Sequence, residues 1–136
     1  MRVYLASRFE RQEELKRLRT QLRFMGQEVI SSWLDVMARP SPQGAEDPWH
    51  EFAKEWSIND IRDLEQCELL ILDTRGGSGH RGGMHVEFGY AYATGKELVV
   101  LGKKLNVFHY LPGVLNFSTE EEMFESPLFH SLIKKT

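Results

Sequence analysis

Glu87 has the surroundings of a reactive side chain. It follows the glycine-rich run of residues 74–83, in a segment that predicts a helix. The first turns of a helix favour a negative charge, because their backbone N–H groups and the helix dipole point toward it. Gly82 and Gly89 on either side leave room for a ligand. A carboxylate facing such a crevice can attack a sugar carbon and form a covalent glycosyl intermediate. The alternative is a solvated glutamate that only stabilises its helix.

The glycine-rich run favours a cradle for a phosphate or a ribose, because backbone N–H groups in such loops bind anions. Its candidate substrate contacts are Ser78, Gly79, Arg81 and Gly83. The letters GSGHRG also match a dinucleotide-binding fingerprint in form, but here they follow the third predicted strand rather than the first. We therefore expect no NAD and no other cofactor. The alternative is a flexible turn without a ligand.

Four further polar side chains lie where they can reach the same crevice. Asp73 ends a predicted strand, so it either contacts the substrate or caps its own loop. Asp60 and Asp63 are three residues apart on a predicted helix and can share one face, with one toward the cleft and the other solvated. Tyr4 lies in the first predicted strand, where it is either a core aromatic residue or a hydrogen-bond donor to Glu87.

The histidines and the single cysteine do not have the pattern of a metal site. None of the five histidines has the spacing of a metal-binding motif, and one cysteine cannot form a thiolate cluster. We therefore expect no metal. His85 and His109 are candidate polar contacts, although single histidines are more often structural. Cys67 lies in an apolar run and is typical of a small buried side chain.

Strands and helices alternate along the chain. The periodicity predicts strands at 2–6, 28–31, 67–73, 97–102 and, weakly, 113–117. It predicts helices before Gly26, over 48–66 with Asp47 as N-cap, and over 84–94 before Gly95. Capping boxes are expected at Ser7 with Glu10 and at 118–121. Residues 35–48 predict a long irregular segment, of the kind that often covers an active site.

This alternation predicts one α/β domain over residues 1–136, a parallel sheet of about five strands with helices on both faces. Ligands of such sheets bind beyond the carboxyl ends of the strands. The corresponding places are 6–9, 32–35, 73–83 and 102–106. The first of them contributes Ser7 and Arg8 as candidate substrate contacts.

Composition excludes some classes of partner. Seventeen Lys and Arg against twenty Asp and Glu give a net charge of −3 without a basic tract, so binding to a nucleic acid polymer is not expected. A single nucleotide needs only a local site. The first apolar run is too short for a signal peptide or a membrane span, so we expect a cytoplasmic protein without a membrane partner.

Three segments carry a family likeness: VYLAS (3–7), KEWSINDIRDLEQCELLILD (54–73) and GGMHVEFGYAYATGKELVVLG (82–102). They resemble the nucleoside 2-deoxyribosyltransferases and the related deoxynucleotide N-hydrolases. The resemblance implies a flavodoxin-like sheet, with Glu87 as the nucleophile, Tyr4 as the catalytic tyrosine and Asp60 as the catalytic aspartate. It also implies a homodimer or larger homo-oligomer in which a neighbour's polar side chain, here Asn106, completes the sugar site. Arg81 stands where some relatives place an acid or a phosphate-binding serine, which favours a 5′-phosphorylated substrate.

We therefore expect an enzyme that cleaves the N-glycosidic bond of a 2′-deoxynucleoside through a glycosyl-Glu87 intermediate and transfers the sugar to another free base. Asp60 would help protonate the departing base. Two alternatives stay open: hydrolysis of a nucleoside 5′-monophosphate, and a non-catalytic nucleotide-binding module.

Overall fold

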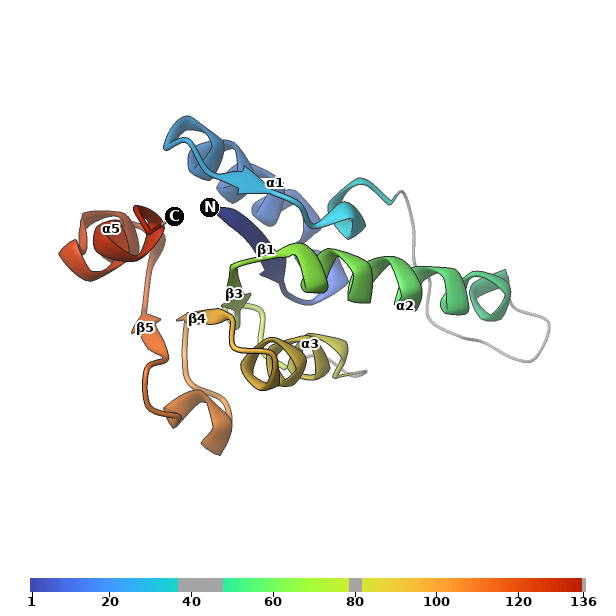
Figure 1. Cartoon of the computed structure of the whole chain (residues 1–136). Coiled ribbons are helices and arrows are strands. Elements are labelled where there is room, and N and C mark those ends of the chain that lie inside the picture. The colour runs from blue at the N-terminus through green and yellow to red at the C-terminus, as the bar shows by residue number, and fades with distance from the viewer. Residues whose placement is uncertain (37–47, 79–81, 136) are drawn as a thin grey trace.

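The sheet is the framework of the molecule. The computed structural model describes residues 1–36, 48–78 and 82–135, and over these ranges the chain forms five parallel strands (Figure 1). They are β1 (Arg2–Ala6), β2 (Glu28–Val29), β3 (Leu69–Asp73), β4 (Glu97–Leu101) and β5 (Leu115–Phe117). Their order across the sheet is β2-β1-β3-β4-β5. The predicted α/β class and the predicted number of strands are confirmed.

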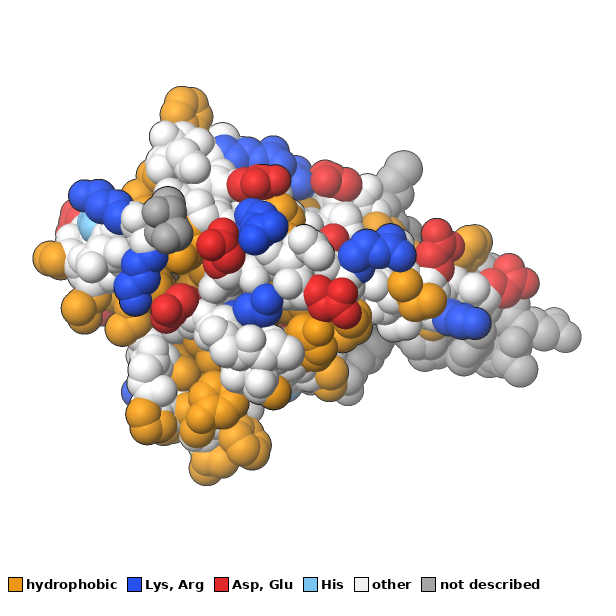
Figure 2. Space-filling model, viewed as in Figure 1, with side chains coloured by type: hydrophobic (Ala, Val, Ile, Leu, Met, Phe, Trp, Pro, Cys, Tyr) orange, Lys and Arg blue, Asp and Glu red, His pale blue; other side chains and the backbone are white. Residues whose placement is uncertain are grey.

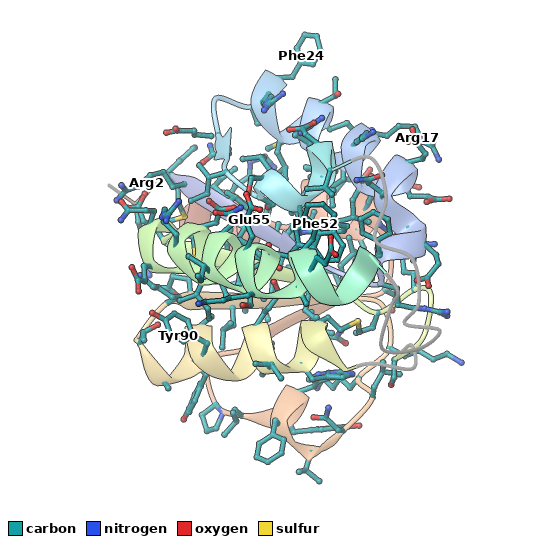
Figure 3. The ribbon with its side chains drawn as sticks, turned by 90° about the vertical axis from the view of Figure 1, so that its right-hand side faces the viewer. Arg2, Arg17, Phe24, Phe52, Glu55 and Tyr90 are labelled. Carbon is teal, nitrogen blue, oxygen red and sulfur yellow. The ribbon has the colours of Figure 1, made fainter. Side chains whose placement is uncertain are left out.

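Helices connect the strands and cover the sheet. They are α1 (Gln12–Phe24), α2 (Pro48–Gln66), α3 (Gly83–Ala93), α4 (Glu120–Glu125) and α5 (Pro127–Ile133). Three short 3-10 helices accompany them: η1 (Phe9–Arg11), η2 (Ser32–Asp35) and η3 (Val107–Tyr110). The helices α2 and α3 lie side by side on one side of the strands, and α5 lies on the other (Figures 1 and 3). In the described ranges, no helix is both long and apolar enough to cross a membrane.

The core forms between the sheet and its helices. Every residue of β3 is buried, as expected for a central parallel strand that is covered on both faces. On α1 the buried residues recur at helical spacing, at Leu15, Leu18 and Leu22. Because the central strands are packed on both faces, the residues at their carboxyl ends are held in fixed positions.

The connections reverse direction between β1 and β3. From β1 the chain passes outward to β2, and from β2 it returns across β1 to β3. Since such crossovers are right-handed, the reversal sends successive helices to opposite faces and leaves a crevice between the ends of β1 and β3. Ala6 pairs with Leu72 at this point, so the residues after Ala6 and Asp73 lie next to each other.

Three local expectations were wrong. Ser7 does not cap the first helix, because its hydroxyl donates to Asp73, and the helix begins through η1 with no side-chain cap. The second capping box lies one residue later, with Thr119 accepting from the Glu122 amide and Glu122 accepting from the Ser118 amide. The second strand ends at Val29 rather than at residue 31. Helix α5 was not predicted, and Asp47, the expected N-cap of α2, lies outside the described residues.

Gly102 offers a test of how tightly the carboxyl ends of β3 and β4 are packed. Its φ is +120°, and a Cβ there would overlap Thr74 Oγ1 and approach the amide nitrogen of Arg75 at 3.0 Å. Gly113 has a φ of +89° but open space around it. We expect Gly113→Ala to lose about 1 kcal/mol of unfolding free energy from backbone strain. Gly102→Ala should lose about 3 kcal/mol of unfolding free energy, because the overlap of the new Cβ with Thr74 is added to the backbone strain. Urea unfolding measures both, and equal losses would contradict the packing described here.

Candidate active site

Tyr4 and Glu87 meet between the sheet and helix α3. Tyr4 is fully buried in β1, and its hydroxyl donates a hydrogen bond to Oε2 of Glu87, 83 residues along the chain. Glu87 lies in the second turn of α3 and is half-buried, so its carboxylate is neither in bulk solvent nor sealed inside the core. Apart from its chain neighbours and the backbone of its own helix, a Cβ added at Gly82, Gly83 or Gly89 would meet no atom of the described residues within 4 Å. The described residues therefore leave space around this part of α3.

The surroundings of Tyr4 keep its proton in place. Burial raises the pKa of the Tyr4 hydroxyl well above its ordinary value, and the negative charges of Glu87 and Asp60, the hydrogen bond to Glu87 and the charge of Asp63 raise it further. The phenol is therefore protonated at neutral pH and serves as a donor to the carboxylate. A donor held this firmly fixes the direction in which Glu87 points.

Helix α2 carries two acids whose charges reach Tyr4 and, nearer its amino-terminal end, two stacked aromatic rings. Asp60 and Asp63 are both near enough to Tyr4 for their charges to raise its pKa. Phe52 and Trp56 stack with ring centroids 5.9 Å apart and an interplanar angle of 29°. Phe52, Trp56 and Asp60 follow one another at intervals of four residues, so they share one helix face. The two rings were not predicted as site residues, although this spacing could have indicated them.

Asp73 is the most heavily bonded acid at the end of the sheet. It is fully buried and accepts from Ser7 Oγ at 2.7 Å, from Arg11 Nε at 2.6 Å and from Arg75 Nε at 2.7 Å. Burial alone would raise the pKa of this carboxyl group, but the hydrogen bonds from Arg75, Arg11 and Ser7 outweigh burial and lower it. These contacts favour the interpretation of Asp73 as the anchor of its loop over that of a substrate contact.

Two arginines at this end of the sheet, Arg8 and Arg75, each have one buried guanidinium nitrogen that is not used in a hydrogen bond among the described residues. Arg8 Nη1 donates to the carbonyl of Gly76 at 2.6 Å, and Arg75 Nη1 donates to Glu120 at 2.5 Å. Arg8 Nε and Arg75 Nη2 are buried without a hydrogen-bond acceptor among the described residues. Arg8 Nε lies 3.5 Å from Glu10, outside good hydrogen-bond geometry. The ends of β1 and β3 therefore carry two buried guanidinium N–H groups that have no acceptor among the described residues.

The other predicted contacts of the glycine-rich run fall in different surroundings. Ser78 is exposed at the end of the described loop, and Gly83 is the first residue of α3. Gly79 and Arg81 lie outside the described residues, so their predicted contacts stay predictions.

Asn106 and His109 lie in the segment after β4. The side-chain oxygen of Asn106 accepts from the Phe108 amide at 2.9 Å and caps η3. His109 is buried, accepts from the Leu105 amide, and packs against the rings of His85 and Phe88. Burial lowers the pKa of both histidines, so both are neutral at pH 7. These contacts favour a structural role for His109.

Two shallow surface grooves lie apart from Tyr4 and Glu87. One has a volume of about 340 Å³ and follows helix α2 along Ser57, Ile61 and Glu65. The other, of about 320 Å³, lies at the opposite end of the sheet beside Cys67 and Glu97. Neither contains a residue discussed above as a site residue. In the described part of the chain, no three His, Cys, Asp or Glu side chains are grouped closely enough to hold a metal ion.

Two solved structures share this architecture over nearly their full length. A CMP N-glycosidase from Clostridium botulinum, BcmB, has a TM-score of 0.60 and 23% sequence identity, covering 99% of this chain and 100% of that one. A 2-deoxyribosyltransferase from Bacillus psychrosaccharolyticus has a TM-score of 0.66 and 20% identity, covering 97% and 96%. This chain has their fold. The predicted flavodoxin-like sheet is thereby confirmed, and its strand order agrees. No family model and no curated protein sequence matches the chain.

The Asp73 anchor gives a prediction about pH. Asp73→Asn removes the negative charge that holds two partly buried arginines, so we expect a loss of about 3 kcal/mol or more of unfolding free energy at pH 7. A carboxyl group whose pKa is lowered by folding stabilises the protein above its unfolded pKa, and that stabilisation is lost as the pH falls through the folded pKa. The difference between the wild type and the variant should therefore narrow below about pH 4.

Asp35→Asn is the matched control, because Asp35 pairs with Arg19 at an exposed position. It should cost less than about 1 kcal/mol. Urea unfolding between pH 3 and pH 7 measures the unfolding free energy of the wild type, of Asp73→Asn and of Asp35→Asn. A difference between the wild type and Asp73→Asn that does not change with pH would contradict the role of the buried charge.

Proposed function

We propose that this protein is an enzyme of the nucleoside 2-deoxyribosyltransferase type and cleaves the N-glycosidic bond of a nucleoside or nucleotide, with Glu87 as the nucleophile. The observation that carries the proposal is the hydrogen bond from the buried Tyr4 hydroxyl to the half-buried Glu87 carboxylate, at the switch point of a flavodoxin-like sheet. A carboxylate that is oriented by a firm donor can attack an anomeric carbon. The likeness in fold to a deoxyribosyltransferase and to a CMP N-glycosidase supports the same class of reaction.

The proposed reaction has two steps. The Glu87 carboxylate forms a bond to C1′ while the bond from C1′ to the base nitrogen breaks, and the base leaves with the electron pair. Asp60, on the α2 face that bears on Tyr4, helps to deliver the proton that the base needs. A nitrogen of a second base, or water, then attacks C1′ and releases the sugar, and the Glu87 carboxylate is restored.

Transfer to a second base is the first form of the proposal. It needs a surface that holds a planar base and limits the access of water. The stacked rings of Phe52 and Trp56, on the helix face that leads to Asp60, offer such a surface. Figure 3 shows Phe52 near the amino-terminal end of α2. Flat aromatic groups stack on any base, so this feature does not select one base.

Hydrolysis of a nucleoside 5′-monophosphate is the second candidate, and a separate observation favours it. Arg8 and Arg75 bring to the ends of β1 and β3 buried N–H groups that have no acceptor in the part of the chain that the structure describes. A phosphate could accept from both, since guanidinium groups suit phosphate oxygens. Arg81 would add to this site if it turns the same way. A binding module without turnover is the third candidate.

A second copy of the chain is part of the proposal. Val107, Phe108 and Tyr110 of η3 and Val86 of α3 are exposed apolar side chains. Figure 2 shows hydrophobic side chains gathered at the lower end of the molecule, where the segment between β4 and β5 lies in Figure 1. An apolar patch of this kind favours a protein contact. Because Asn106 caps η3, a partner seated there would bring its own Asn106 close to the helix that carries Glu87.

Glu87→Ala should lose kcat by about 1,000-fold or more while the protein stays folded, because the nucleophile is removed. Tyr4→Phe should lose about 10- to 100-fold, since the carboxylate remains but is no longer held in one direction. The purified proteins are incubated with deoxynucleosides and with deoxynucleoside 5′-monophosphates, with and without a free base. Chromatography then follows bases and sugars.

The products separate the candidates. Exchange of bases indicates a transferase, and free deoxyribose or its phosphate indicates a hydrolase. Binding without any product indicates a binding module. Glu121→Ala, on an exposed position of α4, is the matched control and should keep full activity. Normal turnover by Glu87→Ala would contradict the proposed role of Glu87 as the nucleophile.

A mixing experiment tests the partner's contribution. Glu87→Ala and Asn106→Ala should each be inactive alone, but an equal mixture allowed to exchange subunits should recover about a quarter of wild-type activity, since half of the dimers are mixed and each has one intact site. Sedimentation velocity reports the assembly, and activity reports the site. Dimers that form but show no recovery would contradict a shared site.

A further inference from the structure

The end of strand β1 is held by side chains instead of by a neighbouring strand. Strand β2 pairs only with Arg2 and Val3, and the last ladder bond on this side runs from the Ile30 amide to the carbonyl of Val3. The peptide groups of Leu5 point to the same side, where β2 has already ended. Leu5 is fully buried, so these groups need partners inside the protein.

Two side chains next to and within η2 supply those partners. The Leu5 amide donates to Ser31 Oγ at 2.6 Å, and Trp33 Nε1 donates to the Leu5 carbonyl at 2.7 Å. Both side chains are buried. Ser31 and Trp33 thus replace a strand next to the residue that follows Tyr4.

The segment that carries these two side chains is fixed to helix α2 by one carboxylate. Oδ2 of Asp63 accepts from the Ser32 amide at 2.9 Å and from Ser32 Oγ at 2.5 Å. Asp63 is half-buried, not solvated as one of the two acids of α2 was expected to be. Its negative charge also contributes to the raised pKa of the Tyr4 hydroxyl.

We propose that Asp63 is a positioning residue for the reaction: it holds Ser32, so that Ser31 and Trp33 clamp the Leu5 peptide and keep Tyr4 directed at Glu87. This inference rests on the proposed function for its effect on turnover, but the clamp itself is a property of the folded chain. Asp63 acts through Ser32 and the strand and needs no contact with the substrate.

Two substitutions of Asp63 separate the attachment from the charge. Asp63→Asn removes the charge but keeps an oxygen that can accept from Ser32, whereas Asp63→Ala removes both. We expect kcat of Asp63→Ala to fall by about 10- to 100-fold, because a small misplacement of a catalytic group has this effect, with little change in KM. Asp63→Asn should keep most of the wild-type kcat.

Hydrogen exchange measures the clamp without any substrate. In the wild type and in Asp63→Asn, the indole N–H of Trp33 and the amide of Leu5 should exchange slowly. In Asp63→Ala both should exchange at least about tenfold faster, since the segment opens locally. Trp33→Phe identifies the indole signal. Asp35→Ala is the matched control, because Asp35 also attaches η2, to Arg19, but at an exposed position, and it should change neither kcat nor exchange.

Ser32→Ala is the second variant, in case Asp63→Ala does not fold. It removes one of the two bonds to Asp63 and should give a smaller change of the same kind. Wild-type kcat and slow exchange in Asp63→Ala, or in Ser32→Ala if Asp63→Ala does not fold, would overturn the inference. So would an equal loss of kcat in Asp63→Asn and Asp63→Ala. If the wild type turns over none of the nucleosides or nucleotides, the proposed function has failed, and exchange alone decides whether Asp63 holds the clamp.

Discussion

A buried hydroxyl must have an acceptor, and this constraint ties the sheet to helix α3. Tyr4 is fully buried in β1, and an unbonded phenol there would cost about 1 to 3 kcal/mol. Glu87 is its acceptor, so the position of α3 over the sheet and the direction of one carboxylate are set by the same bond. Because the raised pKa keeps the proton on the phenol at neutral pH, Tyr4 remains a hydrogen-bond donor to Glu87 there.

Two acids at the carboxyl end of the sheet have opposite surroundings. Asp73 is surrounded by donors from Ser7, Arg11 and Arg75, which lower its pKa and fix the loops after β1 and β3. Its negative charge is paired with Arg11 and Arg75. Glu87 faces a neutral phenol, with glycines that leave space around its helix. Burial with cationic donors thus produces an anchor, whereas partial burial beside a neutral donor leaves a carboxylate suited to bond formation.

Patterns along the sequence were enough for the strands. They left the hydrogen bond from Tyr4 to Glu87 as one of two alternatives, and the family resemblance, rather than the periodicity, favoured it. They were not enough for the clamp on Leu5 or the bond from Asp63 to Ser32, because those partners lie 26 to 31 residues apart and no local period relates them. The capping box at Ser7 failed for the same reason. The local pattern of Ser7 with Glu10 predicted that the Ser7 hydroxyl would cap the helix, but this hydroxyl donates to the distant carboxylate of Asp73 instead.

The acids whose charges reach Tyr4 also bear on the proposed chemistry. The negative charges of Glu87, Asp60 and Asp63 all raise the pKa of the Tyr4 hydroxyl. In the proposed reaction, Glu87 loses its negative charge when it becomes an ester of the sugar, so the negative charge that acts on Tyr4 falls in the intermediate. Cleavage of an N-glycosidic bond also develops positive charge at the anomeric carbon, which a nearby negative charge stabilises. In the proposed reaction, negative charge near Tyr4 would therefore favour the cation-like transition state, and the hydrogen bond from Tyr4 would hold the Glu87 carboxylate in one direction.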